Sequence, residues 1–207
     1  MIGEEQSELV IDNEQDLALC FQDIEDRCLK LENFEEAGMT VEEMIKVLEG
    51  PVLKAVQSFS LFSPNESLKE VHTEHMKFLA LPYHLGWLYG RSMQPRRANV
   101  ETSRNYLTTF LELMEQFECE EESIFPKSFM GIWKEQQKDT SFRPSRDQVV
   151  QAMKESKVIE QRYRNSEIIK EEKEQRQAIR DFLSMQIHTS LTQLRTIEEE
   201  LKILTYK

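Results

Sequence analysis

The sequence is poor in the two residues that most often end helices and build turns. Only six glycines and six prolines occur among its 207 residues, and neither occurs from Ser145 to Lys207. A β-sandwich or barrel requires more turn residues than this, whereas a helical protein does not. We therefore expect an all-α fold. Because the length suits one ordinary domain, we expect a single domain over residues 1–207.

The chain also lacks an excess of positive charge. Lys and Arg total 26 against 38 Asp and Glu, which gives a net charge of −12. The overall field of such a protein repels a phosphate backbone, so we expect no nucleic-acid partner, and any basic contact surface must be local. No apolar run is long enough to span a membrane, and the first ten residues, MIGEEQSELV, do not resemble a signal peptide. We expect a cytoplasmic monomer without membrane contact.

The motifs of the common enzyme classes are missing. There is no glycine-rich phosphate loop and no Cys-x-x-Cys spacing, and no histidine has a glutamate three residues before it, as a di-iron bundle requires. His72 and His75 lie one turn apart beside Glu74, but such a pair at a capping segment is typical of solvated or core-edge residues. We therefore expect no catalytic residue, no metal site and no cofactor.

The three cysteines, Cys20, Cys28 and Cys119, predict reduced thiols. Their number is odd, and no histidine near them in sequence would activate a nucleophile. Cys20 and Cys28 lie eight positions apart on one expected helix, about 12 Å along its axis. A disulfide allows at most about 7 Å between Cα atoms, so these two cannot pair. Buried small side chains are the simplest interpretation.

Apolar spacing predicts two helices in the first 60 residues. Residues 13–34 place Leu17, Phe21, Ile24, Cys28 and Leu31 on one face. Thr40 and Glu43 form a capping box that opens a second helix, which continues to about residue 59. Gly50 and Pro51 interrupt this helix. Since the apolar register continues beyond them, we expect a kink, with a break as the alternative.

Residues 61–90, LFSPNESLKEVHTEHMKFLALPYHLGWLYG, hold the densest apolar stretch. Ser63 and Glu66 form a capping box that predicts a short helix from Pro64. Thr73 is a second possible N-cap, opening a helix over residues 74–90 that is apolar on nearly every face and therefore buried. We expect Pro82 to kink this helix near Phe78 and Gly86 to allow close approach of a neighbouring helix.

The second half of the chain combines a clear helix, a loop and a helical end. Residues 100–117 follow a strict three-and-four apolar spacing, whereas residues 119–144 lack a sustained period. We expect a long loop there with at most one short helix, anchored by Phe125, Phe129 and Trp133. Ser145 and Gln148 then cap long helices over about 145–207, as one continuous helix or as a hairpin. Two apolar stripes predict the buried faces of this end: a weak one at Val149, Met153, Ile159 and Tyr163, and a strong one at Ile179, Leu183, Ile187, Leu191, Leu194, Leu201 and Leu204.

Two basic clusters stand out in this acidic chain. One consists of Arg91, Arg96 and Arg97, and the other of Lys154, Lys157, Arg162 and Arg164. They could be solvated helix positions with partners one turn away, such as Glu160 for Arg164. They could instead form a contact surface for an acidic partner.

Several stretches resemble the N-terminal domain of the type 2A phosphatase-associated proteins, the family of mammalian alpha four. They are residues 61–90, VETSRNYLTTFLELMEQFE, VIEQRYRNSEI and SLTQLRTIEEELKIL, and they occur in the family's order. The resemblance implies an antiparallel helical stack of tetratricopeptide-like or 14-3-3-like type.

The same resemblance implies a function without catalysis. Family members bind the catalytic subunits of type 2A-like serine/threonine phosphatases, sequester or stabilise them, and act in nutrient-kinase (TOR-type) signalling. The family's contact uses basic residues around the QRYR segment, so Lys154, Lys157, Arg162 and Arg164 are the expected phosphatase-binding residues. The alternative is a generic helical adaptor that binds a helix or acidic segment of another partner.

Overall fold

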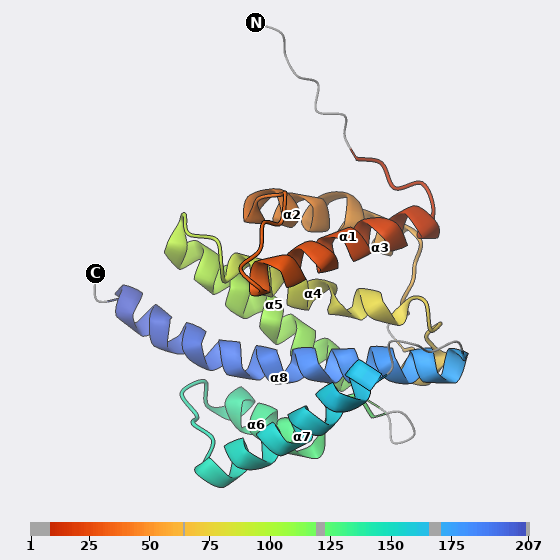
Figure 1. Ribbon diagram of the computed structural model, residues 1–207. Coiled ribbons are helices and arrows are strands. Elements are labelled where there is room, and N and C mark those ends of the chain that lie inside the picture. The colour runs from red at the N-terminus through yellow and green to blue at the C-terminus, as the bar shows by residue number, and fades with distance from the viewer. Residues whose placement is uncertain (1–8, 64, 119–122, 166–170, 206–207) are drawn as a thin grey trace, which may run out of the picture. The chain divides into compact units, whose positions relative to one another are not determined.

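The computed structural model describes residues 9–63, 65–118, 123–165 and 171–205, and every regular element within these ranges is helical (Figure 1). The expected all-α fold is confirmed. The chain divides into two compact units, the N-terminal unit Met1–Leu61 and the C-terminal unit Phe62–Lys207. The expectation of a single domain over residues 1–207 stays a prediction.

The N-terminal unit contains two helical stretches. Its elements are α1 (Glu14–Glu32), α2 (Val41–Val47), a π-helical turn (Leu48–Val52) and α3 (Leu53–Ser58). Asn13 caps α1 by accepting a hydrogen bond from the backbone N–H of Asp16, and Thr40 and Glu43 form the expected capping box before α2. The apolar face predicted for α1 is confirmed, because Leu17, Phe21, Ile24 and Cys28 are buried.

The Gly50–Pro51 pair changes the second stretch to a π-helical turn without ending the helix. The wider π-helical turn includes Pro51, and the residues on either side of the turn, Val47 and Leu53, keep helical backbone angles. A proline removes one helical hydrogen bond and crowds the preceding turn, and a π-helical turn gives it room. The chain therefore continues as a helix from α2 through the π-helical turn into α3, so the alternative break is excluded.

The start of the C-terminal unit differs from the prediction. The backbone N–H of Ser63 donates to the Glu66 carboxylate, and the Ser63 carbonyl accepts from the backbone N–H of Glu66, as expected of a turn. The described residues that follow, 65–67, are not helical, and Pro64 lies outside the described residues. The capping box that does open a helix is Ser67 with Glu70, at a short 3₁₀ helix (Leu68–Glu70). Both pairs have the same spacing, so local sequence alone does not distinguish them.

The buried helix expected over residues 74–90 is two elements. A 3₁₀ helix (Met76–Ala80) leads into α4 (Leu81–Tyr89), so Pro82 lies in the first turn of α4. The expected kink near Phe78 is wrong, because a proline at this position costs no hydrogen bond and begins a helix instead of bending one. Thr73 does not cap a helix; its hydroxyl donates to Glu172 of α8.

A close contact between α4 and α5 (Arg96–Gln116) forms part of the core. A Cβ on Gly86 would lie 2.7 Å from Cγ of Leu107, closer than packed carbon atoms approach. The Ser103 hydroxyl donates to the Gly86 carbonyl at 2.6 Å. The expected close approach at Gly86 is therefore confirmed. The apolar spacing of α5 is confirmed as well, since Leu107, Phe110 and Met114 are fully buried.

The segment expected to be mostly loop contains α6 (Lys127–Lys138). The three expected anchors, Phe125, Phe129 and Trp133, are all buried. Glu115 of α5 fixes this helix by accepting a hydrogen bond from Nε1 of Trp133 at 2.9 Å. The three anchors and, in the described part of this segment, the single helix are confirmed, but the expected long loop is wrong, because this helix has 12 residues, which is an ordinary helix length.

The C-terminal end is a hairpin of α7 (Arg146–Asn165) and α8 (Glu172–Thr205), which pack on each other. The alternative of one continuous helix is therefore excluded; residues 166–170, which connect the two, lie outside the described residues. The central part of the strong stripe on α8 is buried, namely Leu183, Ile187, Leu191 and Leu194. The weak stripe is partly wrong, because Met153 is 54% exposed.

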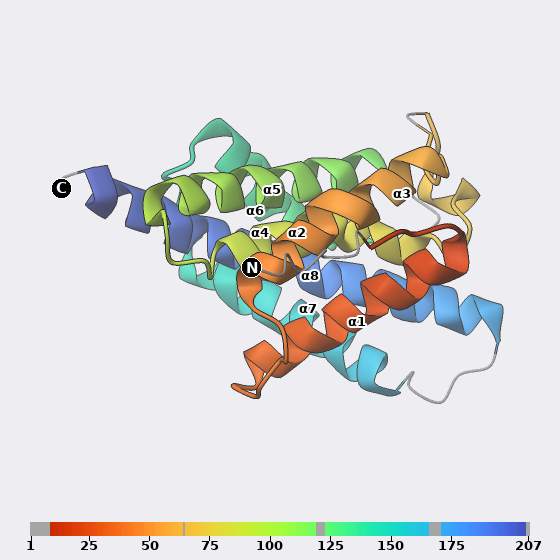
Figure 2. The same ribbon diagram turned by 90° about the horizontal axis from the view of Figure 1, so that it is seen from above.

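α8 is the longest helix and contacts α5, α6 and α7 (Figures 1 and 2). Three consecutive glutamates near its end pair with arginines from different places in the C-terminal unit. Glu198 pairs with Arg104 of α5, Glu199 with Arg143 of the α6–α7 connection, and Glu200 with Arg96 at the start of α5. Successive helical residues point about 100° apart, which lets adjacent side chains reach separate partners. None of the described helices is both long and apolar enough to cross a membrane.

Candidate functional site

Helix α7 has one face toward the core and one toward solvent. Its start is fixed by the expected capping box, in which Ser145 N–H donates to Gln148 at 2.8 Å and Gln148 N–H donates to the Ser145 hydroxyl at 3.3 Å. Ala152 and Ile159 are buried, 2% and 7% exposed. Seven positions are two helical turns, so these residues lie on the same side and the opposite side faces solvent.

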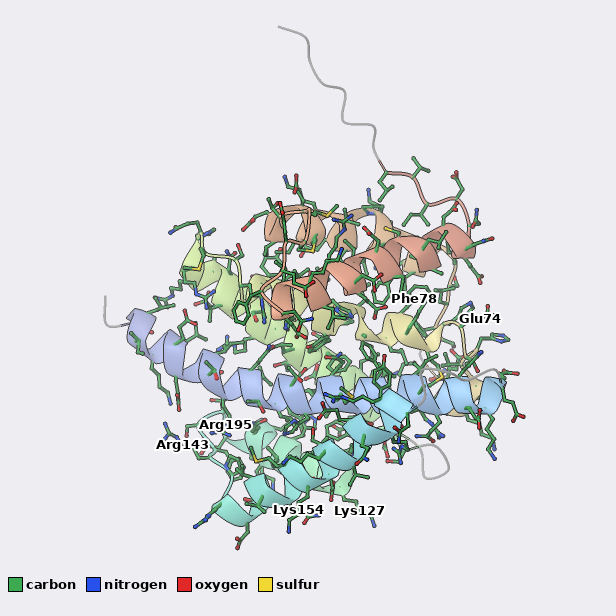
Figure 3. The ribbon with its side chains drawn as sticks, viewed as in Figure 1. Glu74, Phe78, Lys127, Arg143, Lys154 and Arg195 are labelled. Carbon is green, nitrogen blue, oxygen red and sulfur yellow. The ribbon has the colours of Figure 1, made fainter. Side chains whose placement is uncertain are left out.

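The solvent-facing side carries most of the expected basic residues. Lys154, Lys157, Gln161 and Arg164 are all exposed, as their spacing of three and four predicts. Neither Lys154 nor Lys157 forms an ion pair within the part of the chain that the structure describes. Figure 3 shows Lys154 on the outer side of α7. These two charges are therefore available to a partner.

The two arginines of the cluster already have acidic partners. Arg164 pairs with Glu160 one turn before it, as expected for a solvated helix position, and its side chain is 73% exposed. Arg162 reaches across to α8, where its Nε donates to Oδ2 of Asp181 at 2.6 Å and a second N–H donates to Oδ1. The hydrogen bonds to Asp181 raise the pKa of Arg162. Burial has the opposite effect, but it is the smaller of the two.

Arg162 therefore has a structural role. The Asp181 side chain is only 1% exposed, and Gln177 donates a further hydrogen bond to it at 2.9 Å. A buried carboxylate needs such partners because its desolvation is costly. The Arg162 side chain remains 53% exposed, so part of it is also accessible at the edge of the solvent-facing side.

Three apolar side chains lie among the cations. Val150, Met153 and Val158 are 41%, 54% and 63% exposed. We define the α7 outer surface by its exposed residues: Val150, Met153, Lys154, Lys157, Val158 and Arg164. A group of exposed apolar side chains on one side of a helix is a feature of protein interaction surfaces. The exposure of Met153 was not predicted, because its spacing also fits the helical period of the weak core-facing stripe.

A further lysine extends the basic region from α6. The Ser128 hydroxyl donates to Glu155 of α7 at 2.6 Å, which brings the start of α6 to the middle of α7. Lys127 is exposed beside this contact, and Figure 3 shows it at the same edge of the molecule as Lys154. No local signal in the sequence could reveal this neighbour, since the start of α6 reaches the middle of α7 only when the two helices pack together.

The other basic cluster, Arg91, Arg96 and Arg97, is occupied by contacts within the C-terminal unit. Arg96 forms two hydrogen bonds with Glu200, at 2.6 and 2.7 Å, and donates to the carbonyls of Gly90 and Ser92. Arg97 pairs with Glu101 at 3.1 Å. The guanidinium of Arg91 lies over the ring of Trp87. This cluster is consequently a weaker candidate for a partner surface.

The cysteines and histidines do not form an alternative site in the described ranges. Cys20 and Cys28 are reduced thiols, as expected, and Cys119 lies outside the described residues. Burial, followed by the charge of Asp23, raises the pKa of Cys20 and so disfavours the reactive thiolate. The same ranges contain no cluster of three or more His, Cys, Asp or Glu side chains placed to hold a metal ion.

Comparison with known proteins assigns the chain to a family. The sequence model of the TAP42-like family matches residues 17–207. The chain belongs to the TAP42-like family. The resemblance identified from the sequence is thereby confirmed, and it extends to α1, which lies before the stretches on which that resemblance was based.

Two individual proteins support the TAP42-like assignment. A rice protein (Oryza sativa subsp. japonica) described as "PP2A regulatory subunit TAP46" is 31% identical over 122 residues, which are 58% of this chain and 27% of that protein. The match thus spans about a quarter of the rice protein's length. A solved structure described as "The Structure of Tap42 Alpha4 Subunit" superposes with a TM-score of 0.69 at 18% identity, covering 91% of this chain and 97% of that one. At this identity the superposition shows that the TAP42-like fold is shared.

Proposed function

We propose that this TAP42-like chain is a non-catalytic regulator that binds the catalytic subunit of type 2A-like serine/threonine phosphatases. The family assignment supports this proposal, and so does the rice relative, which is named as a regulatory subunit of PP2A. The expectation that the chain is not an enzyme agrees with a regulatory relative. We further propose that it acts as a cytoplasmic monomer that sequesters or stabilises the catalytic subunit in TOR-type signalling.

The α7 outer surface is the proposed contact. The observation that carries this assignment is the pair of exposed lysines, Lys154 and Lys157, which have no acidic partner in the described chain although its net charge is −12. Cations that the fold itself does not neutralise are free to attract an acidic partner surface. Met153 and Val158 supply apolar area that such a contact would remove from water.

The four expected contact residues have different roles in this proposal. Lys154 and Lys157 supply free charge, and Arg164 adds charge that Glu160 partly neutralises. Arg162 positions α7 on α8 through Asp181 and contributes only its exposed edge. Lys127 of α6 widens the basic surface.

The test is a double charge reversal, Lys154→Glu with Lys157→Glu, measured by calorimetric titration with purified phosphatase catalytic subunit. Two attractive contacts become repulsive, so we expect about 100-fold weaker binding, as for close charge pairs at a partly desolvated interface. The thermal melt should be unchanged, because Lys and Glu are similar helix formers at exposed positions. A separate Met153→Ser variant should weaken binding less, through lost apolar contact alone.

A matched control carries the same charge change elsewhere. Lys173 and Lys202 are exposed on α8, and their reversal to Glu should leave the affinity within about threefold of wild type at physiological salt, where charges farther apart than about 8 Å are screened. Equal losses in both double variants would mean that only net charge matters. Full affinity in the Lys154/Lys157 variant would place the phosphatase contact away from the α7 outer surface.

A further inference from the structure

A groove of about 640 Å³ lies between α5, α6 and α8 in the C-terminal unit. It shares no residue with the α7 outer surface. Its volume is within the range of about 300–1,000 Å³ that is usual for ligand sites. The groove extends along α5 from Arg104 to Glu112, which is about 12 Å at 1.5 Å per residue.

The groove combines an apolar floor with two buried polar atoms that the fold leaves unpaired. Trp133 and Leu194 line it with only 3% and 8% of their surface exposed. Gln136 of α6 is 7% exposed, and its Oε1 has no hydrogen-bond partner; its amide N–H donates weakly to the Leu191 carbonyl at 3.4 Å. Nε of Arg195 on α8 is also buried without a partner.

Unpaired buried polar atoms are rare in folded proteins, because each loses its hydrogen bonds to water without replacement. Two of them on facing helices of one groove therefore indicate an adaptable recognition site. The terminal amide torsion of glutamine is soft, so a small rotation would turn Oε1 of Gln136 toward the groove. Figure 3 shows Arg195 on the side of α8 that faces α6 and the α6–α7 connection.

The groove is lined by one cation and one anion that have no ion-pair partner in the described chain. Arg104 is neutralised by Glu198 at 3.6 Å, which leaves Arg195 without an acidic partner in the described chain. Arg195 precedes Glu198 by about one helical turn, and α5 and α8 run antiparallel, so Arg195 lies about 4.5 Å from this contact, toward the middle of the groove. Glu112 lies at the opposite end, is exposed, and likewise has no basic partner among the described residues.

We propose that this groove binds an extended peptide segment of a partner protein, with an acidic side chain at Arg195 and a basic side chain at Glu112. An extended chain advances about 3.3 Å per residue, so about four residues fill the 12 Å between the ends. The peptide carboxylate accepts hydrogen bonds from Arg195, and a peptide backbone N–H donates to Oε1 of Gln136. The polarity of the charges fixes the direction in which the segment lies.

The proposal is independent of the phosphatase contact on α7 and can be tested with short peptides. The probe is a capped hexapeptide with an aspartate and a lysine three positions apart and alanine elsewhere, tested in both orders. Binding is followed by the fluorescence of Trp133 in a Trp87→Phe background, because these are the only two tryptophans and Trp87 lies in the core away from the groove lining. We expect saturable binding of one order, and about tenfold weaker binding when asparagine replaces the aspartate, the loss typical of one charged hydrogen bond.

Two variants and two controls complete the test. Arg195→Gln should weaken the aspartate peptide about tenfold and make it equal to the asparagine peptide. Gln136→Leu should weaken both peptides while raising the melting temperature, since it removes an unpaired buried atom. If Trp87→Phe disturbs the fold, isothermal titration of the unmodified chain replaces the fluorescence readout. The exposed Arg97→Gln control and the Lys154→Glu/Lys157→Glu variant should bind as wild type.

Absence of saturable binding in both orders, or equal affinity for the aspartate and asparagine peptides in the unmodified groove, would overturn the proposal. So would loss of peptide binding in the α7 variant with binding retained in Arg195→Gln, which would place the peptide on the α7 outer surface. A lower melting temperature for Gln136→Leu would show that Gln136 serves only the packing of α6 on α8.

Discussion

The two basic clusters of this chain have similar composition but face different surroundings. Arg96 is held by Glu200 and by two backbone carbonyls, whereas Lys154 and Lys157 have no acidic partner within the described chain. Arg162 is part of the cluster with Lys154 and Lys157 in the sequence. Like Arg96, however, it is held by a carboxylate within the fold, because it neutralises the buried Asp181. The comparison shows that a cation's role depends on whether a carboxylate elsewhere in the fold reaches it.

The largest effect on stability is expected from Arg162→Ala. It leaves the carboxylate of Asp181, 1% exposed, with only the hydrogen bond from Gln177. Removing one partner of a buried ion pair typically costs about 3–5 kcal/mol, and the exposed half of Arg162 reduces our expectation to about 2–3 kcal/mol. Urea denaturation measures this loss in the free energy of unfolding.

Arg164→Ala is the matched control, since its partner Glu160 is on the same helix and both are exposed. It should cost less than about 0.5 kcal/mol. Equal losses for the two variants would mean that Arg162 is no more structural than its neighbour, and the contrast between internal and free cations would not hold within α7.

An intermediate effect that depends on pH is expected from Glu200→Gln. Hydrogen bonds from Arg96 lower the pKa of Glu200 below its ordinary value of 4.5. The pair therefore stabilises the fold above pH 4.5 and ceases to do so as the pH falls through the lowered pKa of the folded state. We expect the variant to be about 1 kcal/mol less stable at pH 7, and the difference from wild type to shrink below pH 4.5.

The measurement is a series of urea denaturations of both proteins from pH 7 down to the lowest pH at which both still unfold cooperatively. A difference that stays constant across this range would show that the charge of Glu200 is not what Arg96 requires.

The smallest effect is expected from removing the charges of the free cations. Lys154→Gln with Lys157→Gln should change the free energy of unfolding by less than about 0.5 kcal/mol, because exposed residues without partners seldom affect stability. Thermal denaturation checks this. A clearly destabilised double variant would reveal an internal role for these lysines, and the affinity measurements proposed for the charge-reversed pair would then need reinterpretation.

Much of the fold followed from local patterns. The apolar spacing of α1 and α5 and the capping boxes at Thr40 and Ser145 were predicted correctly, because both depend on residues three or four positions apart. Pro82 was misinterpreted for a reason that is also local. A proline in the first turn and a proline in the middle of a helix differ only in where the helix begins, which here depends on the 3₁₀ helix before it.

The candidate site was predictable only in part. The spacing of Lys154, Lys157 and Arg164 placed them correctly on one exposed side of α7. The involvement of Arg162 with Asp181 could not be predicted, because the two residues meet only after α7 and α8 pack as a hairpin. The exposure of Met153 was missed since its spacing also suits the core, and the position of Lys127 depends on the packing of α6 against α7.

The three consecutive glutamates on α8 have a consequence for protein engineering. A run of acidic residues such as Glu198–Glu200 resembles a solvated surface segment, which is commonly replaced when the surface charge of a protein is changed. Here the three glutamates, within one turn of α8, form ion pairs with two positions on α5 and with one position in the α6–α7 connection. Replacing it with lysines would set three arginines against like charge at once, so redesign of this surface should begin elsewhere, for example at the exposed end of α8 beyond Leu201.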